Sequence, residues 1–161
     1  MIETGRRQEE FNNSKEMKMI LTKIFILSFV ISITGCAGHP EEDLVIFAID
    51  FAVTEGKEKE ARNYSEIMSK HVLSSEPETL IYEYYFSEDS QNMYLYEVYK
   101  SSDAATSHVK AFQQGPYLEE FFKLFTLKSF VVMGNSKDDL RTSLEGFAND
   151  YRTLVSGFRR K

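Results

Sequence analysis

A strict alternation of side chains around residue 50 constrains the fold of this chain more than any other feature. The odd-numbered residues of the segment 45–53 are all apolar, whereas the even-numbered ones include Ala48, Asp50 and Ala52. A period of two is typical of a strand with one face buried in a core. The sequence therefore predicts a half-buried β-strand over residues 44–53.

The chain that follows alternates between helical and strand patterns. Segments in which apolar residues recur at helical spacing are 57–73, 104–113 and 117–125. Segments rich in strand-forming residues are 79–86, 92–100 and 127–133. The polar residues between the first two of these strands indicate a hairpin.

The predicted order of elements is β-α-β-β-α-β, followed by an extra helix and a tail. Ser136 is expected to cap the extra helix, which holds Leu140, Leu144 and Phe147, and residues 151–158 are expected to form a short closing strand. This order predicts an α+β fold of the ferredoxin-like type, in which an antiparallel sheet carries both main helices on one face.

The predicted strands are apolar on both of their faces. In the hairpin, Tyr82 alternates with Ile81, and Leu95 alternates with Tyr94 and Tyr96. Because the helices cover only one face of such a sheet, an apolar second face indicates a partner surface. We expect the partner to be a second copy of the chain, so that the protein forms a homodimer.

Residues 1–35 have the layout of a polar extension followed by a secretory signal peptide. Lys18 and Lys23 flank the apolar run 24–33, which is too short to span a bilayer, and a small residue directly precedes Cys36. The junction resembles a bacterial lipobox, whose cysteine receives a lipid. An ordinary export signal followed by a chance cysteine is the alternative.

This interpretation divides the chain into three parts. Residues 1–35 are the extension and signal peptide, 36–43 are a lipidated tether, and 44–161 are one domain with a C-terminal extension from about residue 135. The protein is then expected in the cell envelope, anchored by its lipid to a bacterial membrane on the periplasmic or extracellular side.

Charge and composition argue against several classes of function. The net charge is −6 at pH 7, which argues against a nucleic-acid partner. Cys36 is the only cysteine, so its lipidation leaves no thiol for a disulfide, a nucleophile or a metal site. The sequence has no glycine-rich phosphate loop, no Cys or His pair at metal-ligand spacing and no G-x-S-x-G elbow. We therefore expect neither a metal nor a cofactor.

Four ionisable residues are candidates for chemistry. His108 has apolar neighbours on its helix, so it is either an acid/base or substrate-orienting group or a structural histidine bonded to a nearby acceptor. Asp50 interrupts an apolar strand and is a candidate for proton abstraction, or for pairing with a basic residue across the dimer. Glu83 and Glu97 alternate with aromatic residues and invite the same two interpretations.

Four short segments then occur in a recognisable order. They are EPETLIYE at 76–83, LYEVY at 95–99, SDAA at 102–105 and SH at 107–108. This set resembles the antibiotic biosynthesis monooxygenase superfamily, which commonly shows E-P-G-x-L-x-Y, L-Y-E-x-W/Y and A-x-x-x-H in the same order. The resemblance spans roughly residues 45–133, and Glu78 stands where the family usually has glycine.

The resemblance implies a dimeric α/β barrel of ferredoxin-like protomers, with a pocket between the sheet and its helices. It places His108 at a frequent helix histidine and Tyr99 at an aromatic strand-end position. Tyr82, Tyr99 and Phe112 are expected to bind substrate. Family members that degrade haem carry tryptophan at the strand-end position and a haem-ligating histidine, which has no counterpart in 117–125, so haem chemistry is not expected.

Two functions are compatible with these features. The first is a membrane-tethered, cofactor-independent monooxygenase that acts on a small aromatic or quinol-like substrate, with His108 and Asp50 as catalytic residues. The second is a non-catalytic lipoprotein that binds a small apolar ligand or a protein partner. A pocket in which His108 and an acidic group converge would favour the enzyme.

Overall fold

The computed structural model describes residues 43–159. The predicted signal peptide and Cys36 lie outside these residues. Within the described part, no helix is long and apolar enough to cross a membrane.

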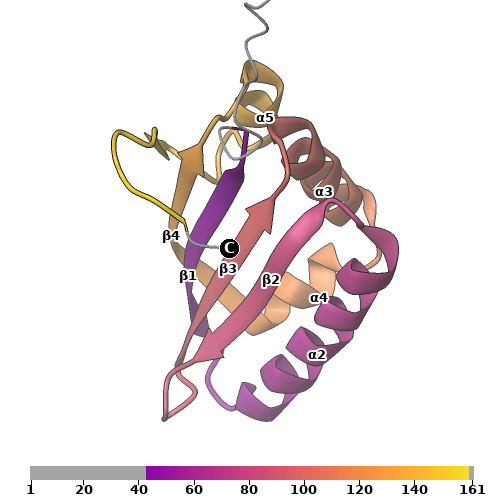
Figure 1. Ribbon diagram of the computed structural model, residues 1–161. Coiled ribbons are helices and arrows are strands. Elements are labelled where there is room, and N and C mark those ends of the chain that lie inside the picture. The colour runs from indigo at the N-terminus through magenta and orange to yellow at the C-terminus, as the bar shows by residue number, and fades with distance from the viewer. Residues whose placement is uncertain (1–42, 160–161) are drawn as a thin grey trace, which may run out of the picture. The chain divides into compact units, whose positions relative to one another are not determined.

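Nine elements follow one another along the described chain. They are β1 (Val45–Val53), α2 (Glu58–Ser75), β2 (Thr79–Phe86), β3 (Asn92–Tyr99), α3 (Ser102–Gln114), α4 (Leu118–Leu124), β4 (Phe125–Gly134), α5 (Asp138–Ser143) and β5 (Asp150–Arg152). The strands form one sheet in the order β2-β3-β1-β4-β5, in which β5 is parallel to β4 and the other neighbours are antiparallel. The predicted α+β, ferredoxin-like arrangement is thereby confirmed (Figure 1).

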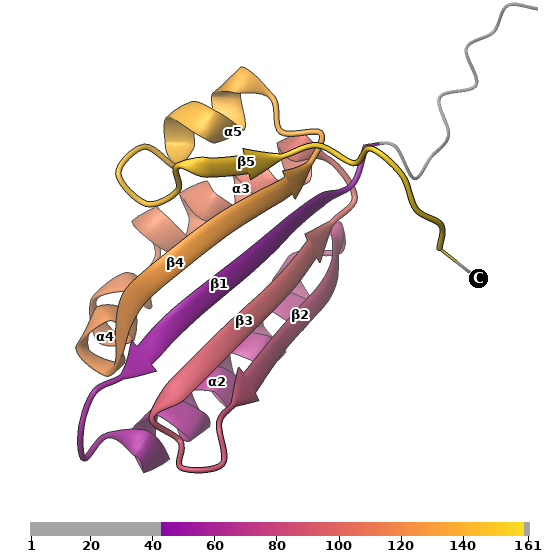
Figure 2. The ribbon, with the colours of Figure 1, turned by 90° about the vertical axis from the view of Figure 1, so that its left-hand side faces the viewer.

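Helices α2, α3 and α4 lie behind the sheet when it is viewed from its open side (Figure 2). The alternation of β1 decides which side chains meet them, because every odd-numbered residue from Val45 to Val53 is buried and Asp50, on the other face, is exposed. Edge-to-face aromatic contacts connect the sheet to the helices: the Phe51 ring of β1 contacts the Phe121 ring of α4, with centroids 5.1 Å apart. The core therefore lies between the sheet and the helices.

The ends of the two long helices follow local sequence signals. Helix α2 ends at Ser75, and Glu76 takes the C-cap position, since the residue before Pro77 is pushed out of the helical region. At the start of α3, the Ser101 hydroxyl accepts a hydrogen bond from the Ala104 amide at 3.1 Å, which is the N-cap geometry that a serine favours.

The C-terminal extension is less regular than the sequence suggests. Helix α5 begins after Lys137, no side chain caps it, and it ends before Phe147. The closing strand is Asp150–Arg152 rather than 151–158. It runs parallel to β4 and pairs with it only as far as Met133, one residue before β4 ends. A strand that continued to residue 158 would have run past the end of β4 and had no β4 residues to pair with.

The open face of the sheet carries a mixture of apolar and polar side chains. It holds the partly buried Tyr94 and Tyr96 of β3 and the exposed Tyr85 of β2. Asp50 lies on the same face, where its carboxylate accepts a hydrogen bond from the Ser129 hydroxyl at 3.1 Å.

Two glycines with left-handed backbone geometry allow a matched test of the close approach between β4 and the start of β1. Gly134 has φ +99°, and a Cβ there would overlap the Leu44 carbonyl oxygen, whereas Gly56 has φ +74° and open space around it. Gly56→Ala should cost only the left-handed strain of about 1–2 kcal/mol. Gly134→Ala adds a backbone displacement, so we expect it to lower the free energy of unfolding by about 3 kcal/mol or more. Urea unfolding of both variants measures this, and equal losses would contradict the steric argument.

Candidate functional site

A cavity of about 80 Å³ lies on the helix side of the sheet. This is several times the volume of about 10–15 Å³ that a single water needs. Seven phenylalanines contribute to its wall: Phe47, Phe51, Phe112, Phe121, Phe122, Phe130 and Phe147. The polar side chains that line it are Tyr82, Glu97, His108 and Gln113. The cavity thus suits a small, largely apolar molecule with a polar group at one end.

Glu97 and His108 both reach the cavity because each lies on the inward-facing side of its strand or helix. Odd-numbered residues of β3 face the helices, so Glu97 points inward like Leu95 and is only 2% exposed. On α3 the buried stripe includes Ala105, His108 and Val109, which are spaced as residues of one helical face. Strand and helix therefore present a carboxyl and an imidazole to the same space.

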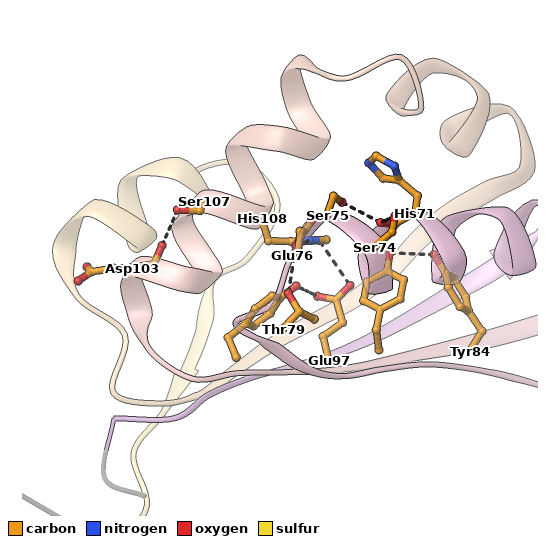
Figure 3. A network of polar contacts seen from close by, with 12 residues as sticks. His71, Ser74, Ser75, Glu76, Thr79, Tyr84, Glu97, Asp103, Ser107 and His108 are labelled. Carbon is orange, nitrogen blue, oxygen red and sulfur yellow. Dashed lines mark hydrogen bonds and ion pairs between the residues drawn. The ribbon is translucent and has the colours of Figure 1, made fainter. Parts of the chain in front are cut away.

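A network of polar contacts connects this pair to the end of α2 (Figure 3). The His108 Nδ1 lies 2.8 Å from Glu76 Oε2, and the Thr79 hydroxyl donates to the same oxygen at 3.0 Å. On the other side of the ring, Nε2 is 3.8 Å from Glu97 Oε1. The Tyr99 hydroxyl donates to Glu97 Oε2 at 2.7 Å. His108 consequently lies between two carboxyl groups.

The pKa values of Glu97, His108 and Glu76 depend on one another. Burial raises the pKa of Glu97, although the His108 charge and the Tyr99 hydrogen bond oppose this shift. For His108, burial lowers the pKa, but the carboxylates of Glu97 and Glu76 outweigh it and leave the pKa raised. Burial would likewise raise the pKa of Glu76, and its hydrogen bond to His108 reverses the shift, so that this pKa is lowered. Glu76 and His108 therefore form an ion pair, beside a Glu97 that takes up a proton more readily than an exposed glutamate does.

The nearby tyrosines are hydrogen-bonding groups rather than bases. Burial raises the pKa of Tyr82 and of Tyr99 well above the usual value, and it raises that of Tyr84 as well. The hydroxyls of Tyr82 and Tyr84 lie 3.0 Å apart and share a hydrogen bond. These phenols stay protonated at neutral pH, so proton transfer at this site depends on Glu97 and His108.

The arrangement can carry out acid–base chemistry on a molecule in the cavity. A carboxyl and an imidazole 3.8 Å apart can both approach one substrate atom. Among residues 43–159, no group of three or more His, Cys, Asp or Glu residues has an arrangement that could hold a metal ion.

The structure brings together most of the residues that the sequence suggested. His108, Tyr82 and Phe112 line the cavity. Tyr99 is fully buried and contacts the site through Glu97 and the imidazole of His108, whose ring centroid is 5.2 Å from its own. Asp50 lies on the open face of the sheet, so the carboxyl group that shares the cavity with His108 is that of Glu97.

The sequence did not distinguish Glu97 from Glu83, and it gave Glu76 no chemical role. Glu97 and Glu83 both alternate with aromatic residues, and only the structure separates them, since Glu97 is buried and Glu83 is exposed. Glu76 was recognised as the end of a helix and as part of a motif. Its contact with His108 spans 32 residues, so the motif itself was the one available signal.

The site predicts how stability depends on pH. Because its pKa is raised, Glu97 in the folded protein keeps a proton that the unfolded chain loses above about pH 4.3. His108, whose pKa is also raised, keeps a proton that the unfolded chain loses above about pH 6.5. Both groups therefore make the free energy of unfolding fall as the pH rises. Glu76, with its lowered pKa, makes it fall as the pH drops through about 4.3. We expect maximal stability at mildly acidic pH.

Glu97→Gln provides the matched variant for this pH dependence, because it keeps the shape of the side chain and removes the titration. The decline in melting temperature between mildly acidic pH and pH 8 should become shallower in this variant. A wild-type stability that increases steadily from pH 5 to 8 would contradict the assigned shifts.

Comparison with known proteins gives structural matches only. No family model and no curated protein matches the sequence. MupZ from Pseudomonas fluorescens superposes with a TM-score of 0.65 at 21% identity, over 73% of this chain and 95% of that one. A conserved protein of unknown function from Bacteroides thetaiotaomicron, described as a possible oxidoreductase, gives 0.51 at 14% identity, over 58% and 99% of the two chains.

A protein of Nitrosomonas europaea, whose name assigns it provisionally to the antibiotic biosynthesis monooxygenases, also gives a TM-score of 0.51. It is 16% identical over 58% of this chain and 91% of its own. The structural neighbours thus include antibiotic biosynthesis monooxygenase-like proteins at low sequence identity, and the chain shares their ferredoxin-like fold.

Proposed function

We propose that this protein is a cofactor-independent monooxygenase that acts on a small aromatic or quinol-like substrate. One observation carries the proposal: the carboxyl of Glu97 and the imidazole of His108 lie 3.8 Å apart at a largely apolar cavity. The fold supports it, since a neighbour with this fold is named, provisionally, as an antibiotic biosynthesis monooxygenase.

The roles of the two groups follow from their charges. Glu97 is the base, because a carboxyl whose pKa is raised by burial accepts a proton more readily than an ordinary one. His108 stays protonated through its ion pair with Glu76. Its positive charge therefore stabilises the anion that forms when the substrate loses a proton.

The reaction balances without a further reactant. In the keto tautomer of a phenolic substrate, Glu97 removes a proton from the activated ring CH₂ group. The carbanion forms a C–O bond with O₂ to give a peroxide, which is then protonated. Loss of the second C–H proton forms the carbonyl and breaks the O–O bond, and the released hydroxide takes a proton to become water. The carbon loses four electrons and O₂ gains four.

Substitution of Glu97 tests this proposal. With small phenolic and quinol substrates, Glu97→Gln should lower oxygen uptake by about 100-fold or more, the scale of a positioned base. Glu83→Gln is the matched control, because Glu83 lies on the neighbouring strand but is exposed. The fold of both variants is checked by circular dichroism. Equal activity of Glu97→Gln and wild type would reject Glu97 as the base.

The alternative function is the binding of a small apolar ligand without turnover. The aromatic wall of the cavity favours it, since such rings bind planar molecules whether or not a reaction follows. Binding of aromatic probes in calorimetry, together with no oxygen uptake across the substrate panel, would select this alternative over the enzyme.

We also propose that the domain is tethered to a bacterial membrane through a lipid on Cys36. The support comes from the basic flank, the apolar run and the small residue before this cysteine. Cys36→Ala should release the protein from the membrane fraction or leave it unprocessed. An intact mass with an unmodified thiol at the mature N-terminus would reject the tether.

The open face of the sheet supports a homodimer. Tyr94 and Tyr96 are only partly buried there, and pairing with a second copy would remove their rings from water. Tyr96→Asp should therefore shift the protein toward monomer in light scattering. Asn63→Asp, which adds the same charge at an exposed position of α2, should leave the assembly unchanged. A wild type that is monomeric at micromolar concentration would contradict this.

A further inference from the structure

The imidazole of His108 lies between two hollows of the fold. One is the cavity, which Glu97 also lines. The other is a small hollow of about 10 Å³ near the end of α2, lined by Glu76 and His108 together with Met68, His71, Ala111, Phe112 and Tyr117. The imidazole thus faces the cavity with one nitrogen and the carboxylate at the hollow with the other.

Solvent exposure of the side chains increases from Glu97 through His108 to Glu76. The exposed fraction is 3% for Glu97, 8% for His108 and 17% for Glu76. The most deeply buried group is therefore Glu97, which lines the cavity, and the most accessible group is the Glu76 carboxylate at the hollow.

We propose that Glu97, His108 and Glu76 form a proton relay between the cavity and solvent, in which Glu76 is the outer member. Imidazole suits the middle position, because it can accept a proton at one nitrogen while it releases another from the opposite one. The outer step is preformed, since Nδ1 and Glu76 Oε2 are in hydrogen-bond contact at 2.8 Å.

The inner step has a different geometry. The 3.8 Å between Nε2 and Glu97 Oε1 exceeds a hydrogen bond, so the Glu97 carboxyl has to move toward the ring for a proton to pass. Its other oxygen is held by the Tyr99 hydroxyl, which leaves Oε1 as the oxygen that moves. Proton exchange at Glu97 is therefore slower than at His108.

The relay explains how a buried pair can keep the protonation state set by the bulk pH. The cavity wall is mostly aromatic, and such a surface offers little support for a chain of waters. Other ionisable groups nearby do not replace Glu76: Tyr82 and Tyr99 lie beside the imidazole, but burial keeps both phenols protonated. His71 also lines the hollow, where its ring contacts that of Tyr117 with centroids 4.8 Å apart.

The role of the relay in catalysis rests on the proposed function, but its existence does not. The proton that Glu97 takes from the substrate leaves through the relay, and solvent supplies the proton that completes the water product, so the relay resets Glu97 and His108 after each turnover. Glu76 contacts neither the cavity nor substrate and is accordingly a positioning residue.

Glu76→Gln separates a relay from a structural bond. The amide oxygen of glutamine can still accept from Nδ1 and from the Thr79 hydroxyl, but the side chain cannot take up a proton. In ¹⁵N-histidine-labelled protein, exchange of the His108 imidazole protons with water should slow by about 100-fold. Glu78→Gln is the control on the same loop, since Glu78 is exposed and pairs with Lys100. It should leave the exchange rate unchanged.

An unchanged His108 exchange rate in Glu76→Gln would overturn the relay. Where oxygen uptake is measured, Glu76→Gln should also lower turnover without a change in KM, and added imidazole should restore it. A wild type without oxygen uptake overturns the proposed function alone, because the exchange experiment needs no substrate.

Discussion

Burial of the Glu97 carboxyl on the helix side of β3 is the constraint on which the arrangement of the site depends. A carboxylate at 2% exposure loses its hydration, and without partners this would cost several kcal/mol. Tyr99 supplies a hydrogen bond from the same strand, and His108 supplies a positive charge from α3. Because that charge is itself buried, it requires a second carboxylate, which Glu76 provides from the end of α2. One inward-facing acid is thus linked, directly or through His108, to its own strand and to two helices.

The two faces of the sheet divide the remaining roles between them. Odd-numbered residues of β1 and β3 build the core and the cavity, whereas Asp50 and Tyr96 belong to the open face. Each face of the sheet stabilises its acidic residue differently. Asp50, on the open face, contacts solvent and the Ser129 hydroxyl, whereas Glu97, on the helix side, depends on Tyr99 and His108. This division explains why ligand chemistry and self-association can be assigned to opposite faces without conflict.

Periodicity predicted the elements and their order, because the burial of one strand face or one helix stripe is a local signal. It could not decide which of the two faces of β3 meets the helices, since the inward face holds Glu97 beside Leu95 and Tyr99, whereas the opposite face holds Tyr94, Tyr96 and Val98 and no charge. The inward direction of Glu97 follows from that choice. Periodicity could not predict the contact between Glu76 and His108 either, because it joins the end of one helix to the middle of another. The extension was the least predictable part, since α5 is short and β5 depends on where β4 ends.

The C-terminal extension is nevertheless part of the site. Leu144 and Phe147 line the cavity, although both lie beyond residue 135, where the predicted ferredoxin-like core gives way to the extension. The Phe147 ring stacks on that of Phe122 from α4 at 6.2 Å, and the Gln113 amide of α3 donates to the Ser143 carbonyl at 3.0 Å. Two helices of the core are thus linked to the extension at one end of the cavity. The ferredoxin-like core supplies the acid–base groups, and the extension completes the apolar wall of the cavity beside them.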